Sequence, residues 1–224
     1  MLNNYDNMGG QTIYINSERR GAISDFADSM RTLLNLRMSA GRDLVLLCIG
    51  TDRITGDSLG PIIGHNLLKN RALGKRAAGR GAFGPSSAGA PDAKCVPPAR
   101  SVPQSEALWG GSISIYGTLE SPVHAKNLSH TLEDIYSCHG RPLVVAVDAS
   151  LGQPQSVGFV TIGAGTLSPG AGIKNSLPDV GDIYVTGIVN SSGSSNLSTL
   201  QNTRLALVVR LADVITKGFV RALK

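Results

Sequence analysis

Hydrophobic residues along the chain form two alternating patterns: unbroken apolar runs, and apolar positions spaced three and four residues apart. The unbroken runs predict strands, because a short apolar run bounded by turn residues is typical of a buried strand. Strands are therefore predicted over residues 44–49, 112–117, 142–150, 156–165 and 182–190. The run "LVLLCI" from Leu44 has no polar alternation, which indicates a central strand covered on both faces.

Helix-spaced apolar positions separate these runs. Phe26, Met30, Leu33 and Leu34 share one face of a helix that Ser24 could cap and Gly41 would end. Further helices are predicted over residues 60–69, 121–138 and 196–223. Strands that alternate with helices predict an α/β fold, a three-layer α/β/α sandwich with a mostly parallel central sheet. Residues 1–20 lack either pattern and are expected to form a flexible N-terminal arm.

The composition changes between residues 70 and 111, which are rich in Ala, Gly, Pro, Ser and Arg. This stretch is predicted to be a loop-like insertion in a single domain that spans residues 21–224. Seven basic and two acidic side chains lie between Lys69 and Glu106, an excess equal to the net charge of +5 of the whole chain. The basic character therefore belongs to the insertion. A tether for an acidic protein or for nucleic acid is the alternative, but the interleaved aromatic residues of a single-strand binder are missing.

Several classes of protein are disfavoured by motifs that the sequence lacks. The three cysteines contain no C-x-x-C pair, which favours reduced thiols in an intracellular protein. No signal peptide and no membrane-length apolar run is present. The stretch "GTDRITGDSLG" matches neither nucleotide-binding glycine motif, and no H-E-x-x-H zinc motif occurs. We therefore expect no nucleotide, no zincin-type metal site, no membrane and no direct nucleic-acid partner.

Two aspartates follow the two most apolar strands. Asp57 comes after the strand at 44–49, and Asp148 ends the strand at 142–150. In open α/β sheets the carboxyl ends of parallel strands share one edge, where ligands bind, so the two carboxylates are expected to converge. Close carboxylates resist ionising together, which leaves one as an acid and the other as a base. This pair predicts water-mediated hydrolysis. The alternative is that each aspartate is a turn residue or a helix cap.

Other polar residues near these strand ends are weaker candidates. Asp52 and Arg53 could form an ion pair that shapes the loop, or could take part in the chemistry. Arg204 lies early in the last predicted helix and could either face solvent or bind substrate. Further residues expected to line the cleft are Thr51, Asn190 and Gly193.

Five ordered motifs resemble the YyaC family of spore proteases. They are "CIGTDRITGDSLGP", "YGTLESPVHAKNL", "VAVDASLG", "LPDVGDIYVTGIVN" and "LQNTRL". That family is similar to the germination protease of spores and, more remotely, to the hydrogenase maturation endopeptidases. The resemblance implies a phosphorylase/hydrolase-like fold. It also implies an endopeptidase that acts in the cytoplasm of the developing spore.

The resemblance also implies roles for residues. Asp57 and Asp148 match the two catalytic aspartates of the germination protease, and the substrates would be spore proteins, such as the small DNA-coating ones. A homo-oligomer is left open. The hydrogenase peptidases hold a metal with a later histidine, but this chain has no histidine after His139, which favours a metal-free acid pair. A metal-dependent maturation peptidase remains the alternative.

The chain also departs from the family after "GIVN". The stretch "SSGSSNLST" replaces the bulky aromatic residues that the family carries there. Loss of a pocket wall would favour a different class of function, a catalytically inactive binding or scaffold protein on the same fold. The insertion at 70–111 is likewise foreign to the family.

Overall fold

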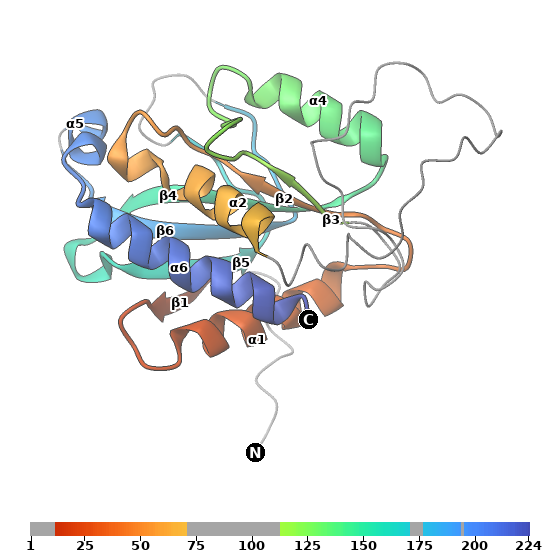
Figure 1. Ribbon diagram of the computed structural model, residues 1–224, viewed down its shortest axis with the longest axis horizontal. Coiled ribbons are helices and arrows are strands. Elements are labelled where there is room, and N and C mark those ends of the chain that lie inside the picture. The colour runs from red at the N-terminus through yellow and green to blue at the C-terminus, as the bar shows by residue number, and fades with distance from the viewer. Residues whose placement is uncertain (1–11, 71–112, 171–176, 194) are drawn as a thin grey trace.

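The computed structural model describes residues 12–70, 113–170, 177–193 and 195–224 (Figure 1). Within these residues six strands form one sheet in the order β1-β5-β6-β4-β2-β3. Strands β3, β2, β4 and β6 are parallel neighbours, whereas β5 is antiparallel to β6 and to β1. The strands are β1 (Ile13–Asn16), β2 (Leu44–Cys48), β3 (Ile113–Tyr116), β4 (Leu143–Gly152), β5 (Phe159–Ala164) and β6 (Ile183–Ser191).

Helices cover the sheet on both faces, so the predicted α/β/α sandwich is confirmed (Figure 1). Helices α1, α2 and α6 pack on one face, and α4 packs on the other. The short helix α5 and the 3-10 turn η1 lie at the carboxyl edge of the sheet and contact each other. The helical elements are α1 (Ala22–Arg37), η1 (Thr55–Asp57), α2 (Leu59–Lys69), α4 (Leu128–His139), η2 (Pro154–Ser156), α5 (Asn196–Gln201) and α6 (Leu205–Ala222).

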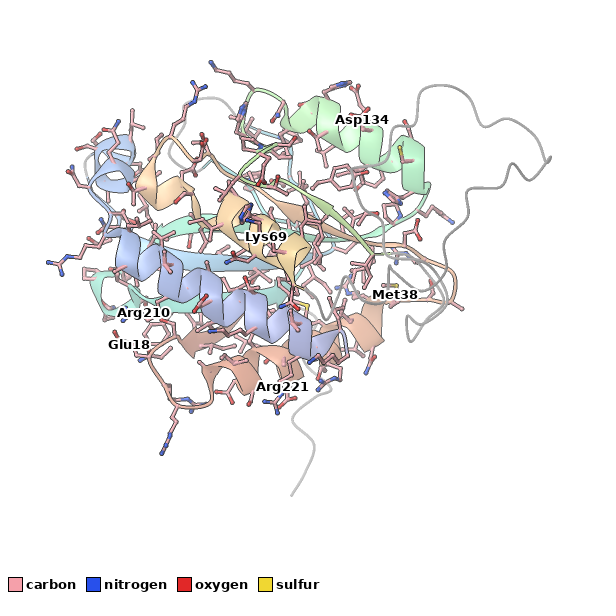
Figure 2. All side chains as sticks on the ribbon, in the orientation of Figure 1. Glu18, Met38, Lys69, Asp134, Arg210 and Arg221 are labelled. Carbon is pink, nitrogen blue, oxygen red and sulfur yellow. The ribbon has the colours of Figure 1, made fainter. Side chains whose placement is uncertain are left out.

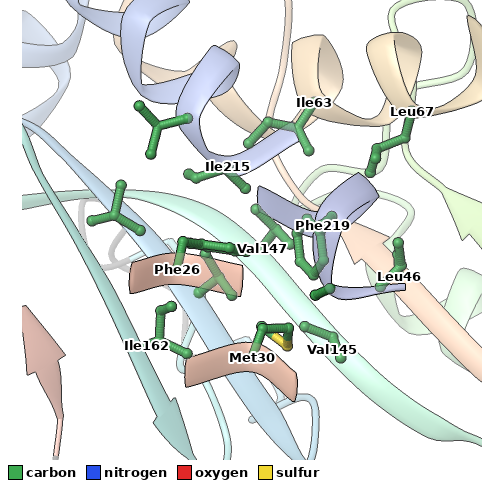
Figure 3. Close-up of a cluster of buried hydrophobic side chains, with 14 of the residues drawn as sticks. Phe26, Met30, Leu46, Ile63, Leu67, Val145, Val147, Ile162, Ile215 and Phe219 are labelled. Carbon is green, nitrogen blue, oxygen red and sulfur yellow. The ribbon is translucent and has the colours of Figure 1, made fainter. Parts of the chain in front are cut away.

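The main hydrophobic core lies between the sheet and helices α1, α2 and α6 (Figure 3). Phe26 of α1 and Phe219 of α6 meet edge to face at its centre, with ring centroids 5.1 Å apart. Every residue of β2 is buried, as the unbroken apolar run predicted. A smaller core beneath α4 contains Val45, Leu47 and Ile135. The side chains of β2 therefore alternate between the two cores.

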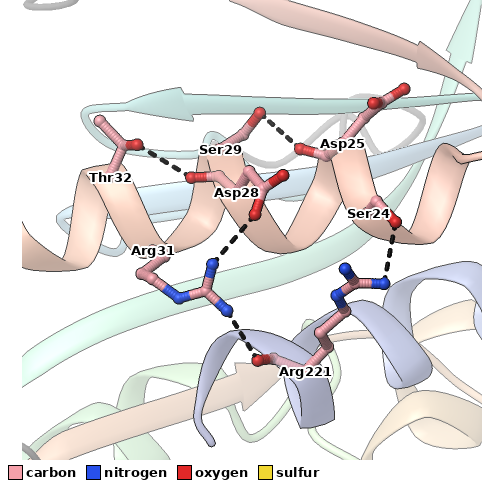
Figure 4. Close-up of polar contacts among 7 residues, drawn as sticks. All are labelled: Ser24, Asp25, Asp28, Ser29, Arg31, Thr32 and Arg221. Carbon is pink, nitrogen blue, oxygen red and sulfur yellow. Dashed lines mark hydrogen bonds and ion pairs between the residues drawn. The ribbon is translucent and has the colours of Figure 1, made fainter.

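Polar contacts join α1 to α6 outside the core (Figure 4). Arg221 donates to the Ser24 hydroxyl at 2.9 Å, and Arg31 donates to the Arg221 carbonyl at 3.0 Å. Glu18, ahead of α1, pairs with Arg210 of α6 at 2.8 Å (Figure 2). These groups are exposed, so each contact stabilises the fold by at most about 1 kcal/mol.

Residues at both ends of the described chain differ from the sequence expectation. Residues 13–16, assigned to the flexible arm, form edge strand β1, because Ile15 is buried beneath α1 when β1 pairs with β5. Residues 1–11 lie outside the described residues. The helix predicted over 196–223 is two helices, α5 and α6, since the chain extends at Arg204 and buries the Thr203 side chain.

Smaller differences concern helix starts. Helix α1 begins two residues ahead of Ser24, after Gly21 in the left-handed conformation (φ 107°). Helix α4 begins at Leu128, directly after turn residues 125–127. Cys48 is a buried free thiol. The insertion at 70–111 lies outside the described residues, apart from Asn70.

In the described chain no helix has the length and apolarity to span a membrane.

Candidate active site

A cavity of about 640 Å³ opens at the carboxyl ends of β2 and β3. One wall is the connection from β2 to α2, and the other is the connection from β3 to α4. Ligands of open α/β sheets bind at this edge. The lining residues are Thr51, Asp52, Arg53, Ile54, Asp57, Leu119, Pro122, His124, Ala125 and Lys126.

Asp57 is held in this cavity by a chain that folds back over the end of β2. The Thr51 backbone N–H donates to the Asp57 carbonyl at 3.0 Å. Gly50 has a φ of +139°, and a Cβ there would lie 2.1 Å from the same carbonyl oxygen. A Cβ at Gly60 would lie 2.0 Å from the Ile49 carbonyl oxygen. These two glycines therefore let α2 begin directly against the strand end, which places Asp57 beside the sheet.

The second wall is fixed to the same strand end. Val123 forms a parallel bridge with Ile49, and its carbonyl accepts the Gly50 N–H at 2.8 Å. Glu120 pairs with His65 of α2 at 2.9 Å, and this pairing lowers the pKa of Glu120. The connection from β3 to α4 is therefore tied both to β2 and to α2.

Asp148 lies on the neighbouring strand β4, opposite Thr186 of β6. Its side chain is on the α4 side of the sheet, because Val147 before it belongs to the other core. The carboxylate accepts the Ala149 N–H at 2.7 Å, and the residue is 6% exposed. Asp148 is not among the residues that line the cavity.

The two carboxyl groups interact electrostatically. Burial raises the pKa of Asp57 from 3.8 to about 6, and the Thr51 N–H lowers it in part. Burial and then the charge of Asp57 raise the pKa of Asp148 well above its usual range, against the backbone N–H groups of Ala149 and Gly170. Close, desolvated carboxyl groups ionise one at a time. Burial therefore raises the pKa of both carboxyl groups, and the charge of Asp57 adds to the rise at Asp148.

The structure brings some predicted site residues together and separates others. Thr51, Asp52 and Arg53 line the cavity with Asp57. Asp52 and Arg53 are both exposed.

Asn190 and Gly193 line a different hollow of about 340 Å³ at the end of β6. The Asn190 amide donates to the Thr199 carbonyl at 3.2 Å, so it holds α5 in place. Helix α5 contacts η1, which carries Asp57, and a Cβ at Gly56 would lie 2.8 Å from the Leu200 carbonyl oxygen. Arg204 precedes α6 and lines neither of these two cavities.

His124 and Lys126 were not predicted as site residues, yet both line the cavity with Asp57. The available signal was the position of "SPVHAKN" after the strand at 112–117. That strand is parallel to β2, so the rule that placed Asp57 at the sheet edge applies to this stretch as well. Among the described residues no group of three His, Cys, Asp or Glu side chains could hold a metal ion.

Comparison with known proteins identifies relatives of this chain. A family described as protein of unknown function (DUF1256) matches residues 14–75 and 108–218. Residues 76–107, inside the predicted insertion, are unmatched. The chain is 40% identical over 194 residues to the "Uncharacterized protein YyaC" of Bacillus subtilis (strain 168), covering 86% of this chain and 76% of that protein. No solved structure matches. The chain therefore belongs to the YyaC-type family, DUF1256.

Proposed function

We propose that this protein is an endopeptidase that hydrolyses peptide bonds of spore proteins with the aspartate pair Asp57 and Asp148, in the cytoplasm of the developing spore. The observation that carries the proposal is the coupled pair of desolvated carboxyl groups beside an open cavity. A strongly raised pKa next to a second titrating group in a cleft is typical of a catalytic site. The relationship to YyaC of a spore-forming Bacillus supports the cellular setting.

The proposed mechanism follows from the unequal burial of the two carboxyl groups. Asp57 lines the cavity and is ionised at neutral pH, so it takes a proton from a water molecule. The water oxygen attacks the peptide carbonyl carbon, and the carbonyl oxygen gains the negative charge. Asp148, which retains its proton, protonates the leaving nitrogen as the C–N bond breaks. The substrate is a peptide segment laid along the sheet edge.

A second candidate function is a binding or scaffold protein without catalysis. Two observations favour it: Asp148 is 6% exposed and outside the cavity lining, and serines occupy much of residues 191–198 beside α5. In that case Asp57 would bind a basic or polar group of a spore protein, and no bond would be cleaved.

The test compares wild-type protein with Asp57→Asn and Asp148→Asn on spore protein extract, with cleavage products identified by mass spectrometry. Asp213→Asn is the matched control, because Asp213 is exposed on α6 and pairs with Lys217. We expect both active-site variants to lose at least about a thousandfold in rate while the control keeps wild-type activity. Equal cleavage by wild type and both variants would exclude the acid pair. Binding of a spore protein without any cleavage would establish the scaffold function.

A further inference from the structure

His124 lines the cavity that also holds Asp57, and its imidazole is bonded within its own turn. The Lys126 backbone N–H donates to Nδ1 of His124 at 3.3 Å. The His124 backbone N–H donates to the Asn127 side chain at 2.8 Å, and the Asn127 amide donates to the Pro122 carbonyl at 3.0 Å. Because Nδ1 accepts a hydrogen bond, the proton of the neutral ring is on Nε2. His124 is therefore a hydrogen-bond donor.

This donor is held at a fixed position relative to Asp57. The neighbouring residue Val123 is bonded to the strand end at Ile49 and Gly50, and the chain then folds back to Asp57 over that same end. Both walls of the cavity are thus anchored to the last residues of β2. A donor placed in advance by such a scaffold stabilises developing charge without a cost of reorganisation.

The two basic side chains that line the cavity, Arg53 and Lys126, are less well fixed than His124. Arg53 and Lys126 both line it, but both residues are exposed. Long exposed side chains lose up to about 2 kcal/mol of rotamer entropy when they are ordered. His124 is partly buried, and its ring nitrogen is already bonded, so it needs no such ordering.

We infer that His124 is a further catalytic residue, whose Nε2–H stabilises the oxyanion formed in the peptidase reaction proposed above. When the water oxygen bonds to the carbonyl carbon, the electron pair of the C=O π bond moves to oxygen, and Asp57 holds the proton lost by the water. Nε2–H donates to the resulting oxyanion. The electron pair returns as the C–N bond breaks, and the nitrogen takes the Asp148 proton. His124 donates a hydrogen bond in this step and transfers no proton. This inference rests on the proposed function.

The experiment measures kcat and KM for His124→Ala, His124→Gln and Asp57→Asn on the spore-derived peptide that the wild type cleaves fastest. We expect His124→Ala to lower kcat about 100- to 1,000-fold with KM changed less than about threefold, as for loss of one oxyanion donor. The amide N–H of glutamine can replace the Nε2 donor, so His124→Gln should recover at least about tenfold of that loss. His130→Gln is the matched control, since His130 is exposed on α4.

The outcomes separate this inference from the proposed function. If His124→Ala keeps kcat within about threefold of wild type while Asp57→Asn is inactive, the role of His124 is wrong and the acid pair stands. An increase in KM alone for His124→Ala would also exclude the oxyanion role. Failure of His124→Gln to recover kcat would exclude it too, because a residue with a merely structural role would give either result. If wild type and Asp57→Asn cleave equally, the proposed function is wrong and the inference is overturned with it.

Discussion

Replacement of Asp57 by asparagine should stabilise the folded protein at neutral pH, although it removes the proposed catalytic base. Burial raises the pKa of this carboxyl from 3.8 to about 6. Ionising Asp57 therefore costs about 3 kcal/mol more in the folded protein than in the unfolded chain, at about 1.4 kcal/mol per pH unit. Asparagine has nearly the same shape and carries no charge. The substitution also removes the charge that raises the pKa of Asp148. This second effect likewise increases the free energy of unfolding.

The sign follows from proton binding in the two states. Between about pH 4 and about pH 6 the folded protein holds a proton that the unfolded chain has released. The free energy of unfolding of the wild type therefore falls as the pH rises through this window, and the asparagine variant lacks this fall. Of the difference of about 3 kcal/mol in the free energy of unfolding between variant and wild type, about 2 kcal/mol should appear between about pH 4.5 and about pH 7.5. The variant should melt roughly 6 to 12 °C higher than wild type at about pH 7.5.

The assay is urea unfolding followed by far-UV circular dichroism at both pH values. Asp213→Asn serves as the control, because its exposed pair with Lys217 is worth at most about 0.5 kcal/mol. A variant less stable than wild type at about pH 7.5, or a stability difference that is the same at both pH values, would refute the conclusion that Asp57 ionises at a desolvated position.

Further predictions concern catalysis, the backbone at the site, the core and metal. The rate of peptide hydrolysis should rise with pH up to about 6, as Asp57 loses its proton. The rate should fall at higher pH, where Asp148 loses its own proton. A rate that is independent of pH below about 6 would contradict the role of Asp57 as the base. Gly60→Ala should destabilise the protein by about 3 kcal/mol in urea unfolding, because its Cβ would lie 2.0 Å from the Ile49 carbonyl oxygen; a loss below about 0.5 kcal/mol would exclude this close approach. Phe219→Ala should lower the free energy of unfolding by about 3 to 5 kcal/mol, since the ring is buried against Phe26; a surface-like loss under about 1 kcal/mol would contradict this packing. Activity should survive dialysis against a chelator if the acid pair works without metal, whereas loss of activity that zinc or nickel restores would establish the metal-dependent alternative.

The sequence by itself determined the framework of the fold and the edge of the sheet that carries the site. The unbroken apolar runs in β2 and β4 identified two buried parallel strands, since a strand covered on both faces has no polar alternation. Asp57 follows β2 and Asp148 lies in the second half of β4, and parallel strands end at one edge, so a shared edge for the two residues could be predicted without coordinates. The helix spacing of Phe26 and Met30 likewise identified the buried face of α1.

Only the tertiary structure decided features that depend on partners far away in the sequence. Strand β1 is four residues long and exists because β5 pairs with it, which no local pattern reports. Arg204 interrupts the predicted last helix, because the chain buries Thr203 there rather than following the periodicity on either side. The sequence placed the stretch with His124 at the same sheet edge, but that His124 and Asp57 line one cavity depends on how the connection after β3 bonds to the end of β2.

The unequal burial of the two carboxyl groups was likewise decided by packing. In the sequence Asp57 comes after one apolar strand and Asp148 belongs to another, yet Asp57 lines an open cavity and Asp148 is 6% exposed. Periodicity describes which face of a strand a residue occupies, whereas desolvation depends on every element that packs over that face. The sequence therefore predicted a pair of acids, and the fold buried Asp148 while leaving Asp57 in the cavity lining.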